Sequence, residues 1–244
     1  MIQGIYTASM AMTPLMDKQD QIANNLANLQ TTGFKQSGVF IKTFQKYLTN
    51  DQKEPFVNST IKTDQTYIDY SAGTSIKTDS PLDVYIQGNG FLTAMTQNGV
   101  RYTRNGNLSL DKDGFIVTSD GAKVLGKQGF IKIDNRYPVN IAENGEVMQN
   151  GESKGVLRIS DFPKPYNFIR DGNSYLQPTS AEATAGEANN YIIRKGYLES
   201  SNVNVIQNMV SMIAANRNFE MDQKAVSAQD ETLEQAVTQV GKVS

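Results

Sequence analysis

Hydrophobic residues near the N-terminus recur at alternating spacings of three and four. The row consists of Ile5, Ala8, Met12, Leu15, Gln19, Ile22, Leu26 and Leu29, and Gln19 is its only polar member. This heptad spacing predicts an amphipathic helix whose apolar stripe packs against another helix. Gly33 follows the row, and glycine is favoured just past the C-terminus of a helix, so the helix is predicted to end there.

A second heptad row occupies the C-terminal forty residues. Its apolar column recurs every seven residues, at Val205, Met212, Phe219, Val226, Leu233 and Val240. The companion column is mixed: Asn202, Met209, Asn216, Gln223, Asp230 and Val237, while Ile206, Val210 and Ile213 widen the apolar face. Polar residues at such positions lower stability but fix register. One such helix usually packs on its own domain. Two at opposite ends of a chain are predicted to pair with each other and with copies from neighbouring subunits.

The middle of the chain follows a different pattern. Turn dipeptides separate short β-branched and aromatic runs, at Asn98-Gly99, Asn105-Gly106, Asp113-Gly114, Asp120-Gly121, Gln128-Gly129, Asn144-Gly145, Asn150-Gly151 and Asp171-Gly172. Asn-Gly and Asp-Gly suit turns that need a positive φ. The pattern predicts a meander of short strands from about Pro81 to Gly196. A sandwich and a small barrel remain equally open.

The fold class is therefore α+β, with a predicted helical, coiled-coil-like domain of residues 1–35 and 197–244 and an all-β domain of residues 69–196. Residues 36–68 are predicted to link the two. Phe40, Phe44 and Leu48 suggest a short helix in this linker, with a turn at 51–55 and an extended, threonine-rich run at 58–69. Residues 178–190 are predicted to form a loop.

Composition excludes most kinds of chemistry. The chain of 244 residues contains no Cys, no His and no Trp, and its 23 Lys and Arg against 25 Asp and Glu give a net charge of −2. Without Cys and His there is no disulfide, no thiolate nucleophile, no imidazole acid or base and no imidazole metal ligand. Gly88-Asn89-Gly90 lacks the third glycine of a nucleotide loop, and the stretch 111–114 lacks the later ligands of a calcium loop. We expect no catalytic residue, cofactor or metal, no nucleic-acid binding and no membrane insertion.

Several segments resemble one family. The stretch IANNLANLQTTGFK at 22–35 and the stretch GYLESSNVN at 196–204 closely resemble the N-terminal and C-terminal signatures of flagellar rod and hook proteins. Residues 209–220, 81–84 and 102–107 also resemble that family. The resemblance covers nearly the whole chain, with the motifs in the family's order.

The resemblance implies a structural subunit of the bacterial flagellar basal-body rod, with no enzymatic activity. The helical domain would line an axial tube and the β-domain would lie outside it. Subunits of this kind are exported unfolded, without a cleaved signal peptide, by the flagellar type III apparatus. They polymerise helically in the periplasm with copies of themselves and other rod and hook proteins, transmitting torque and forming the export channel. The stretch at 68–73 and the pair 219–220 favour the F-type proximal rod subunits over the distal ones, which remain the alternative.

The predicted assembly interface combines both heptad rows with an asparagine cluster. Asn24, Asn25 and Asn28 are expected to lie largely off the apolar seam and to hydrogen-bond neighbouring subunits. The full set is Ile5, Met12, Leu15, Ile22, Asn24, Asn25, Leu26, Asn28, Leu29, Gly33, Phe34, Asn202, Val205, Met209, Met212, Asn216, Phe219, Val226, Leu233, Val237 and Val240.

Two further expectations concern folding. The β-domain should fold alone, since its strands are joined by short hairpins. The terminal helices should become ordered only on assembly, because an isolated helix depends on packing of its apolar face. A secreted β-rich binding module, such as an adhesin, is the alternative from another class, but it does not explain heptads at both ends. An enzyme that uses only carboxylates is a more distant alternative.

Overall fold

The computed structural model describes residues 2–47, 57–172, 174–179 and 185–240. The chain divides into two compact units, and each is built from separate stretches of sequence. The first, called the helical unit, comprises Met1–Ala27, Ser37–Asp69 and Asn204–Ser244. The second, called the β unit, comprises Asn28–Gln36 and Tyr70–Val203. These bounds differ from the predicted ones, because residues 37–68 group with the helices, whereas 28–36 and 197–203 group with the strands.

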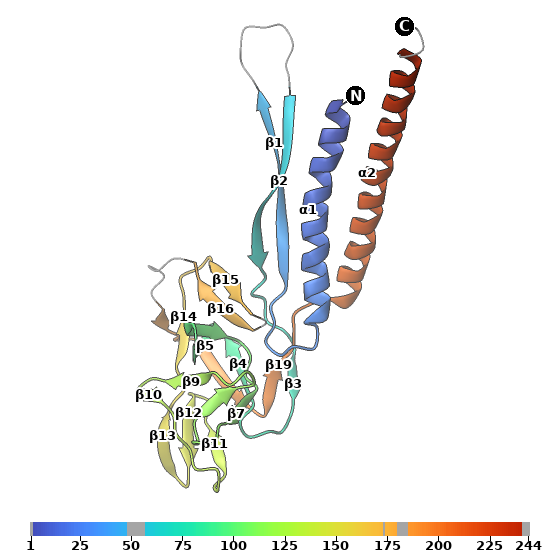
Figure 1. Ribbon diagram of the computed structural model, residues 1–244. Helices are drawn as coiled ribbons and strands as arrows, with labels where there is room; N and C mark the ends of the chain where they lie inside the picture. The colour runs from blue at the N-terminus through green and yellow to red at the C-terminus, as the bar shows by residue number, and fades with distance from the viewer. Residues whose placement is uncertain (1, 48–56, 173, 180–184, 241–244) are drawn as a thin grey trace. The chain divides into compact units, whose positions relative to one another are not determined.

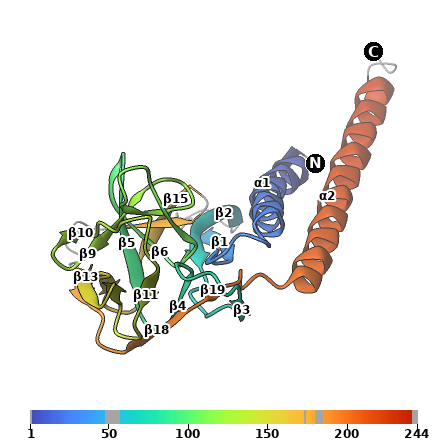
Figure 2. The same cartoon turned by 90° about the horizontal axis from the view of Figure 1, so that it is seen from below.

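The helical unit contains two helices and one long hairpin. Helix α1 (Ile2–Ala27) contacts α2 (Val205–Val240) and also the antiparallel hairpin of β1 (Ser37–Tyr47) and β2 (Val57–Ile68). Figure 1 and, after a 90° turn, Figure 2 both show α1 lying between the hairpin and α2. Helix α1 ends at Ala27, six residues before Gly33, where the sequence predicted its end.

The short helix predicted around Phe40 is wrong, because the segment forms strand β1. It is rich in β-branched and aromatic residues, including the consecutive Val39, Phe40 and Ile41, and such residues favour strands. Ser37 pairs with Ile68 and Tyr47 with Val57, with one irregularity after Phe40. The rings of Phe40 and Tyr67 contact each other across the strands, 4.5 Å between centroids. The predicted extended run at 58–69 is confirmed as β2, while Leu48 and the turn at 51–55 lie outside the described residues.

Helix α2 has a defined start. The side-chain Oδ1 of Asn204 accepts a hydrogen bond from the backbone N–H of Gln207 at 3.0 Å. An asparagine in this position satisfies one of the N–H groups that the first turn of a helix leaves without a partner. The helix then continues for 36 residues.

The β unit consists of short antiparallel strands arranged in open sheets. The main sheet has the strand order β15-β16-β6-β5-β9-β8-β7, with β10, β14 and β17 paired outside this path. Strands β11-β12-β13 form a three-stranded sheet, and β18-β4 and β19-β3 form two-stranded ones. The predicted β-rich middle is thus confirmed, and its described strands close no barrel. Their bounds are β3 (Ser75–Lys77), β4 (Val84–Gly88), β5 (Phe91–Thr96), β6 (Gly99–Thr103), β7 (Leu108–Leu110), β8 (Ile116–Thr118), β9 (Lys123–Gly126), β10 (Gly129–Phe130), β11 (Val139–Ile141), β12 (Glu146–Gln149), β13 (Glu152–Val156), β14 (Ile159–Asp161), β15 (Phe168–Asp171), β16 (Tyr175–Pro178), β17 (Gly186–Glu187), β18 (Tyr191–Lys195) and β19 (Tyr197–Glu199).

The turn dipeptides do not all act in the same way. Gly99, Gly121 and Gly151 have φ values of 99°, 82° and 79°, the conformation that their hairpin turns require. Gly106 is different, because it has no positive φ. A Cβ there would lie 1.7 Å from the carbonyl oxygen of Val84. This glycine therefore serves close backbone approach rather than a turn.

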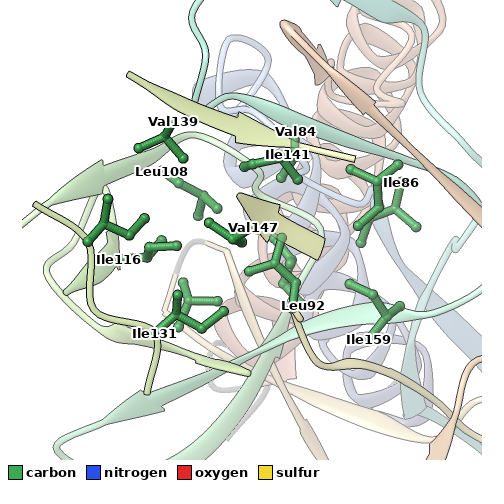
Figure 3. Close-up of a cluster of buried hydrophobic side chains, with 14 of the residues drawn as sticks. Val84, Ile86, Leu92, Leu108, Ile116, Ile131, Val139, Ile141, Val147 and Ile159 are labelled. Atoms are coloured by element: carbon green, nitrogen blue, oxygen red, sulfur yellow. The ribbon is translucent and has the colours of Figure 1, made fainter. Parts of the chain in front are cut away.

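A single apolar cluster holds the β unit together. Figure 3 shows its side chains converging from strands of several sheets. Leu92, Val147 and Leu157 are completely buried within it. Strand β18 also contributes Ile193, so the core needs sequence from near the C-terminal end of the unit. The cluster comprises Val84, Ile86, Leu92, Leu108, Ile116, Val124, Ile131, Ile133, Val139, Ile141, Val147, Leu157, Ile159, Ala188 and Ile193.

Candidate assembly surface

The predicted row on α1 lies on the buried side of that helix. Ile22 is buried, and Met12, Leu15 and Leu26 are partly buried. Pro14 is buried beside this row, although proline inside a helix removes one backbone hydrogen bond. The side chain of Ile5 lies outside the described residues, and Leu29 follows the end of α1 and belongs to the β unit.

The buried side of α2 follows the predicted column of Met212, Phe219, Val226 and Leu233, which are all partly buried, as is Val205. Its companion column is not the one predicted. Asn208 and Ala215 are buried at 4% and 2% exposure, and the column continues through partly buried residues at 222, 229 and 236. The predicted companions Met209, Asn216 and Val237 are exposed, and Asn202 precedes the helix. The column of Asn208 and Ala215 and the column of Met209 and Asn216 lie at the same angle on either side of the apolar column. The small side chain of Ala215 allows another helix to approach α2 more closely on its side. The side chain of Val240 lies outside the described residues.

The first turns of α2 are apolar on the opposite side as well. Ile206, Met209, Val210 and Ile213 are 76%, 53%, 61% and 53% exposed. Their spacing of three and four places them on one stripe, which we call the outer row. It faces away from Ala215, and further along the same stripe the side chains become charged. A helix that is apolar on both sides is typical of one that is covered on both sides in its functional state.

Two of the three asparagines predicted to contact neighbouring subunits are buried within the chain itself. Asn25 is 1% exposed; its Nδ2 donates to the carbonyl oxygen of Ser37 at 2.7 Å, and its Oδ1 accepts from the Ser37 N–H at 3.0 Å. These bonds fasten the start of the hairpin to the end of α1. Asn28 is also buried and accepts a hydrogen bond from the Thr31 hydroxyl at 3.2 Å. The predicted hydrogen bonds to neighbouring subunits stay a prediction, but the described bonds of Asn25 and Asn28 are to residues of the same chain, and of the three only Asn24 is exposed.

The chain segments that enter and leave the β unit meet in a buried ionic network. Lys35 Nζ contacts Glu199 Oε1 at 2.6 Å and donates to the Ser71 carbonyl at 2.7 Å. Glu199 Oε1 also accepts from the Gly73 N–H at 3.0 Å, and Glu199 Oε2 lies 3.6 Å from Arg104 Nη1. The side chains of Lys35 and Glu199 are 4% and 1% exposed. We call these five residues the junction network; it joins the segments around 35, 71 and 199.

Neighbouring contacts close the same junction. Gly33 has a φ of 68°, and a Cβ there would lie 2.4 Å from the Arg104 carbonyl carbon. Phe34 is 1% exposed, and the guanidinium carbon of Arg170 lies over its ring, 4.1 Å from the ring centroid. Burial lowers the pKa of Arg170. Asn202 Oδ1 accepts from the backbone N–H of residue 36 at 2.6 Å. Gly33 and Phe34, which were predicted to be interface residues, are thus enclosed within the β unit itself.

Sequence reasoning missed Lys35, Arg104 and Glu199 as a group. Each falls within or beside one of the motif stretches, but a charged residue there is indistinguishable from a solvated one until the fold brings opposite charges together. Acidic residues in the described part of the chain form no cluster of three that could hold a metal ion. No helix among the described residues combines the length and apolar character needed to cross a membrane.

Comparisons with known proteins agree along the whole chain. Three family descriptions match: "Flagella basal body rod protein" at residues 5–35, "Flagellar hook protein FlgE/F/G D1 domain" at 85–149 and "Flagellar basal body rod FlgEFG protein C-terminal" at 194–239. The flagellar basal-body rod protein FlgF of Buchnera aphidicola subsp. Schizaphis graminum is 35% identical over 250 residues, covering 97% of each chain. FlgF of Caulobacter vibrioides is 30% identical over 250 residues, covering 100% of each chain. The rod protein FlgG of Bacillus subtilis is 30% identical over 262 residues, covering 97% of this chain and 98% of its own. The chain belongs to the flagellar basal-body rod protein family.

Proposed function

We propose that this protein is a non-enzymatic building block of the flagellar rod that polymerises helically through its helical unit. The observation that carries this proposal is the outer row on α2. Ile206 and Val210 expose large apolar side chains on the side of the helix away from α1, where a helix from another subunit would cover them. Burying a large aliphatic side chain contributes roughly 1.5–3 kcal/mol, so a few such contacts would hold subunits together.

We further propose the proximal rather than the distal rod as its location. Alignments with relatives named FlgF run over 239 to 250 residues, close to the 244 of this chain. Alignments with relatives named FlgG run over 256 to 263 residues, so the FlgG chains carry additional sequence that this chain lacks. That difference supports the proximal assignment. Complementation separates the two: this chain should restore motility to a strain lacking its FlgF and not to one lacking its FlgG.

The proposed partners are copies of this chain, other rod and hook proteins and the flagellar type III export apparatus. In the assembled rod the helical units would surround the export channel and transmit torque. Export would occur without a cleaved signal peptide. A β-rich secreted binding module remains a poorer interpretation, since it gives no role to the helix pair or to the apolar stripe on the outer side of α2.

Electron microscopy of the purified full-length chain tests the assembly proposal. The wild-type protein should form tubes or short rods as its concentration is raised. The variant Ile206→Ser/Val210→Ser should stay monomeric, because it removes apolar contacts without touching the side of α2 that faces α1. The matched control is Gln207→Ser/Asn218→Ser, which changes two exposed polar positions on the same helix.

Circular dichroism must accompany this comparison. Equal helix content in both variants, with assembly lost only in the apolar one, supports the proposal. Tubes formed equally well by Ile206→Ser/Val210→Ser would show that the outer row does not drive assembly.

A further inference from the structure

A positively charged groove lies on the β unit, on residues that the assembly proposal does not use. Its volume is about 590 Å³, within the range of sites that hold a ligand or a peptide segment. Four cationic side chains line it against two carboxylates, although the chain as a whole carries a net charge of −2. The lining residues are Lys112, Asp113, Gly114, Lys132, Ile133, Asp134, Asn135, Arg136, Gln149 and Lys154.

One wall of the groove is fixed by a buried amide. Gln149 is 3% exposed, and its side-chain Nε2 donates hydrogen bonds to the carbonyl oxygens of Asp134 and Tyr137 at 2.7 and 3.0 Å. Its Oε1 accepts from the Asp134 N–H at 3.0 Å. All three bonds hold the loop that carries Arg136. A binding surface that is already ordered loses less entropy when a partner docks.

The opposite wall is a turn that is anchored just as firmly. Asp111 Oδ1 accepts from the backbone N–H groups of Asp113 and Phe115, each at 2.9 Å. Gly114 packs directly on the backbone of Ile133, because its carbonyl oxygen accepts a hydrogen bond from the Ile133 N–H at 2.7 Å. A Cβ on Gly114 would lie 2.2 Å from the Ile133 carbonyl oxygen. Both walls therefore have a backbone geometry that does not depend on a ligand.

The cations of the groove differ in how far they are already neutralised. Arg136 is paired with Asp134 at 2.8 Å, and Lys154 is paired with Glu152 at 2.6 Å. Among the described residues, Lys112 and Lys132 have no carboxylate within ion-pair distance. These two ammonium groups are the positive charges that an incoming anion would meet. They stand on different segments of chain, so they suit separated negative charges better than one compact anion.

Aromatic surface lies beside the lysines. Lys132 Nζ sits 5.7 Å from the centroid of the Phe115 ring, which packs edge-on against Phe130 at 6.1 Å. Phe130 is 47% exposed and Tyr137, on the other side of the Asp134–Arg136 loop, is 48% exposed. Exposed aromatic side chains are enriched on surfaces that bind a protein partner.

From this geometry we propose that the groove binds an acidic peptide segment of a partner protein. Its carboxylates would pair with Lys112 and Lys132, and a neighbouring apolar side chain would rest on the exposed ring of Phe130, which packs on Phe115. This recognition mode needs spaced negative charges and an apolar residue, which an extended acidic peptide supplies and a single phosphate does not. The site does not depend on the role of α2, so either proposal can fail without the other.

The test is fluorescence anisotropy of a labelled peptide in which glutamates alternate with phenylalanines, titrated with the full-length chain at low salt. Binding should weaken about tenfold for Lys112→Gln/Lys132→Gln, because two charge pairs are lost. The control Lys77→Gln/Lys195→Gln removes two exposed lysines elsewhere on the β unit and should bind like the wild type. Phe130→Ser should also weaken binding, with circular dichroism showing that each variant is folded.

Four results would overturn the proposal. The first is no binding of the labelled peptide, and the second is binding that the control pair of substitutions weakens as much as the groove pair does. The third is equal binding of a peptide with lysines in place of the glutamates. The fourth is displacement of the peptide by inorganic phosphate or polygalacturonate at equal charge concentration, which would indicate a general anion site or a glycan site instead.

Discussion

Removing one charge from the junction network should destabilise the β unit far more than removing a surface charge. In Lys35→Met the apolar stem is retained and the ammonium group is lost. Glu199, which is 1% exposed, would then keep a buried carboxylate whose nearest remaining cation is Arg104 at 3.6 Å. The Ser71 carbonyl would lose one of its two hydrogen-bond donors as well and keep only the Asn202 amide at 3.1 Å.

Breaking a buried pair by deleting one partner costs about 3–5 kcal/mol, because the other charge stays desolvated. Domains are commonly stable by only about 5–15 kcal/mol, so Lys35→Met should remove a large part of that margin. Replacing both charges removes the buried carboxylate, while the Arg104 guanidinium loses a contact at 3.6 Å but still donates to the backbone carbonyls of Ile86 and Gly88. We therefore expect Lys35→Met/Glu199→Met to be more stable than Lys35→Met alone, which is the reverse of additive behaviour.

Urea unfolding of the full-length chain, followed by the near-ultraviolet circular dichroism of its tyrosines, measures these differences. The matched control is Lys77→Met, which breaks an ion pair with Asp79 whose side chains are 62% and 74% exposed. That change should cost no more than about 1 kcal/mol. A cost for Lys35→Met no larger than for Lys77→Met would refute the reasoning, as would a double variant less stable than both single ones.

Three further outcomes are expected. Asn25→Ala should lower the unfolding free energy by about 1–3 kcal/mol, because it leaves buried backbone groups without partners, while Asn24→Ala at the exposed position should change it by less than about 0.5 kcal/mol in the same urea titration. Burial, and then the hydrogen bond to the Asp161 carboxylate, raises the pKa of Tyr166 to about 12. Its contribution to the free energy of unfolding is therefore present below about pH 10 and is lost as the pH rises towards 12. Tyr166→Phe should make the melting temperature fall less steeply over that pH range. A chain of residues 28–203 should unfold cooperatively at a higher temperature than one of residues 69–196, because only the longer one contains the buried segment that follows α1; equal melting temperatures would contradict this boundary.

Periodicity predicted the helices and the β-rich middle because each pattern reports a local requirement. A spacing of three and four specifies which side of a helix is apolar, and Asn-Gly pairs specify where a chain can turn. The pattern could not choose between the columns of Met209 and Asn208, since both flank the apolar column at the same angle. The small side chain of Ala215, which permits close helix packing, decides the matter only when the partner helix is in place.

The hairpin and the junction network were beyond the reach of such patterns. Phe40, Phe44 and Leu48 recur at a spacing of four, which mimics one helix face, while the β-branched residues between them favour a strand. Pairing with β2 decides in favour of the strand. Lys35 and Glu199 are separated by 164 positions, so no local rule could join them. Long-range partners of this kind are determined by the sheet order, which the sequence left open between sandwich and barrel.

The two units differ in how completely they bury their apolar side chains, and this difference fits a subunit that assembles with others. The β unit encloses its core completely, with Leu92, Val147 and Leu157 at zero exposure and even its main ion pair buried. Most seam residues of α1 and α2 are only partly buried, and the outer row is largely exposed. Ordering a residue costs about 1–2 kcal/mol in backbone entropy, so half-buried helices gain little net stability in a single chain. A second layer of helices would supply the missing burial. We therefore propose that polymerisation completes the burial of the helical unit, whereas the β unit encloses its core within one chain.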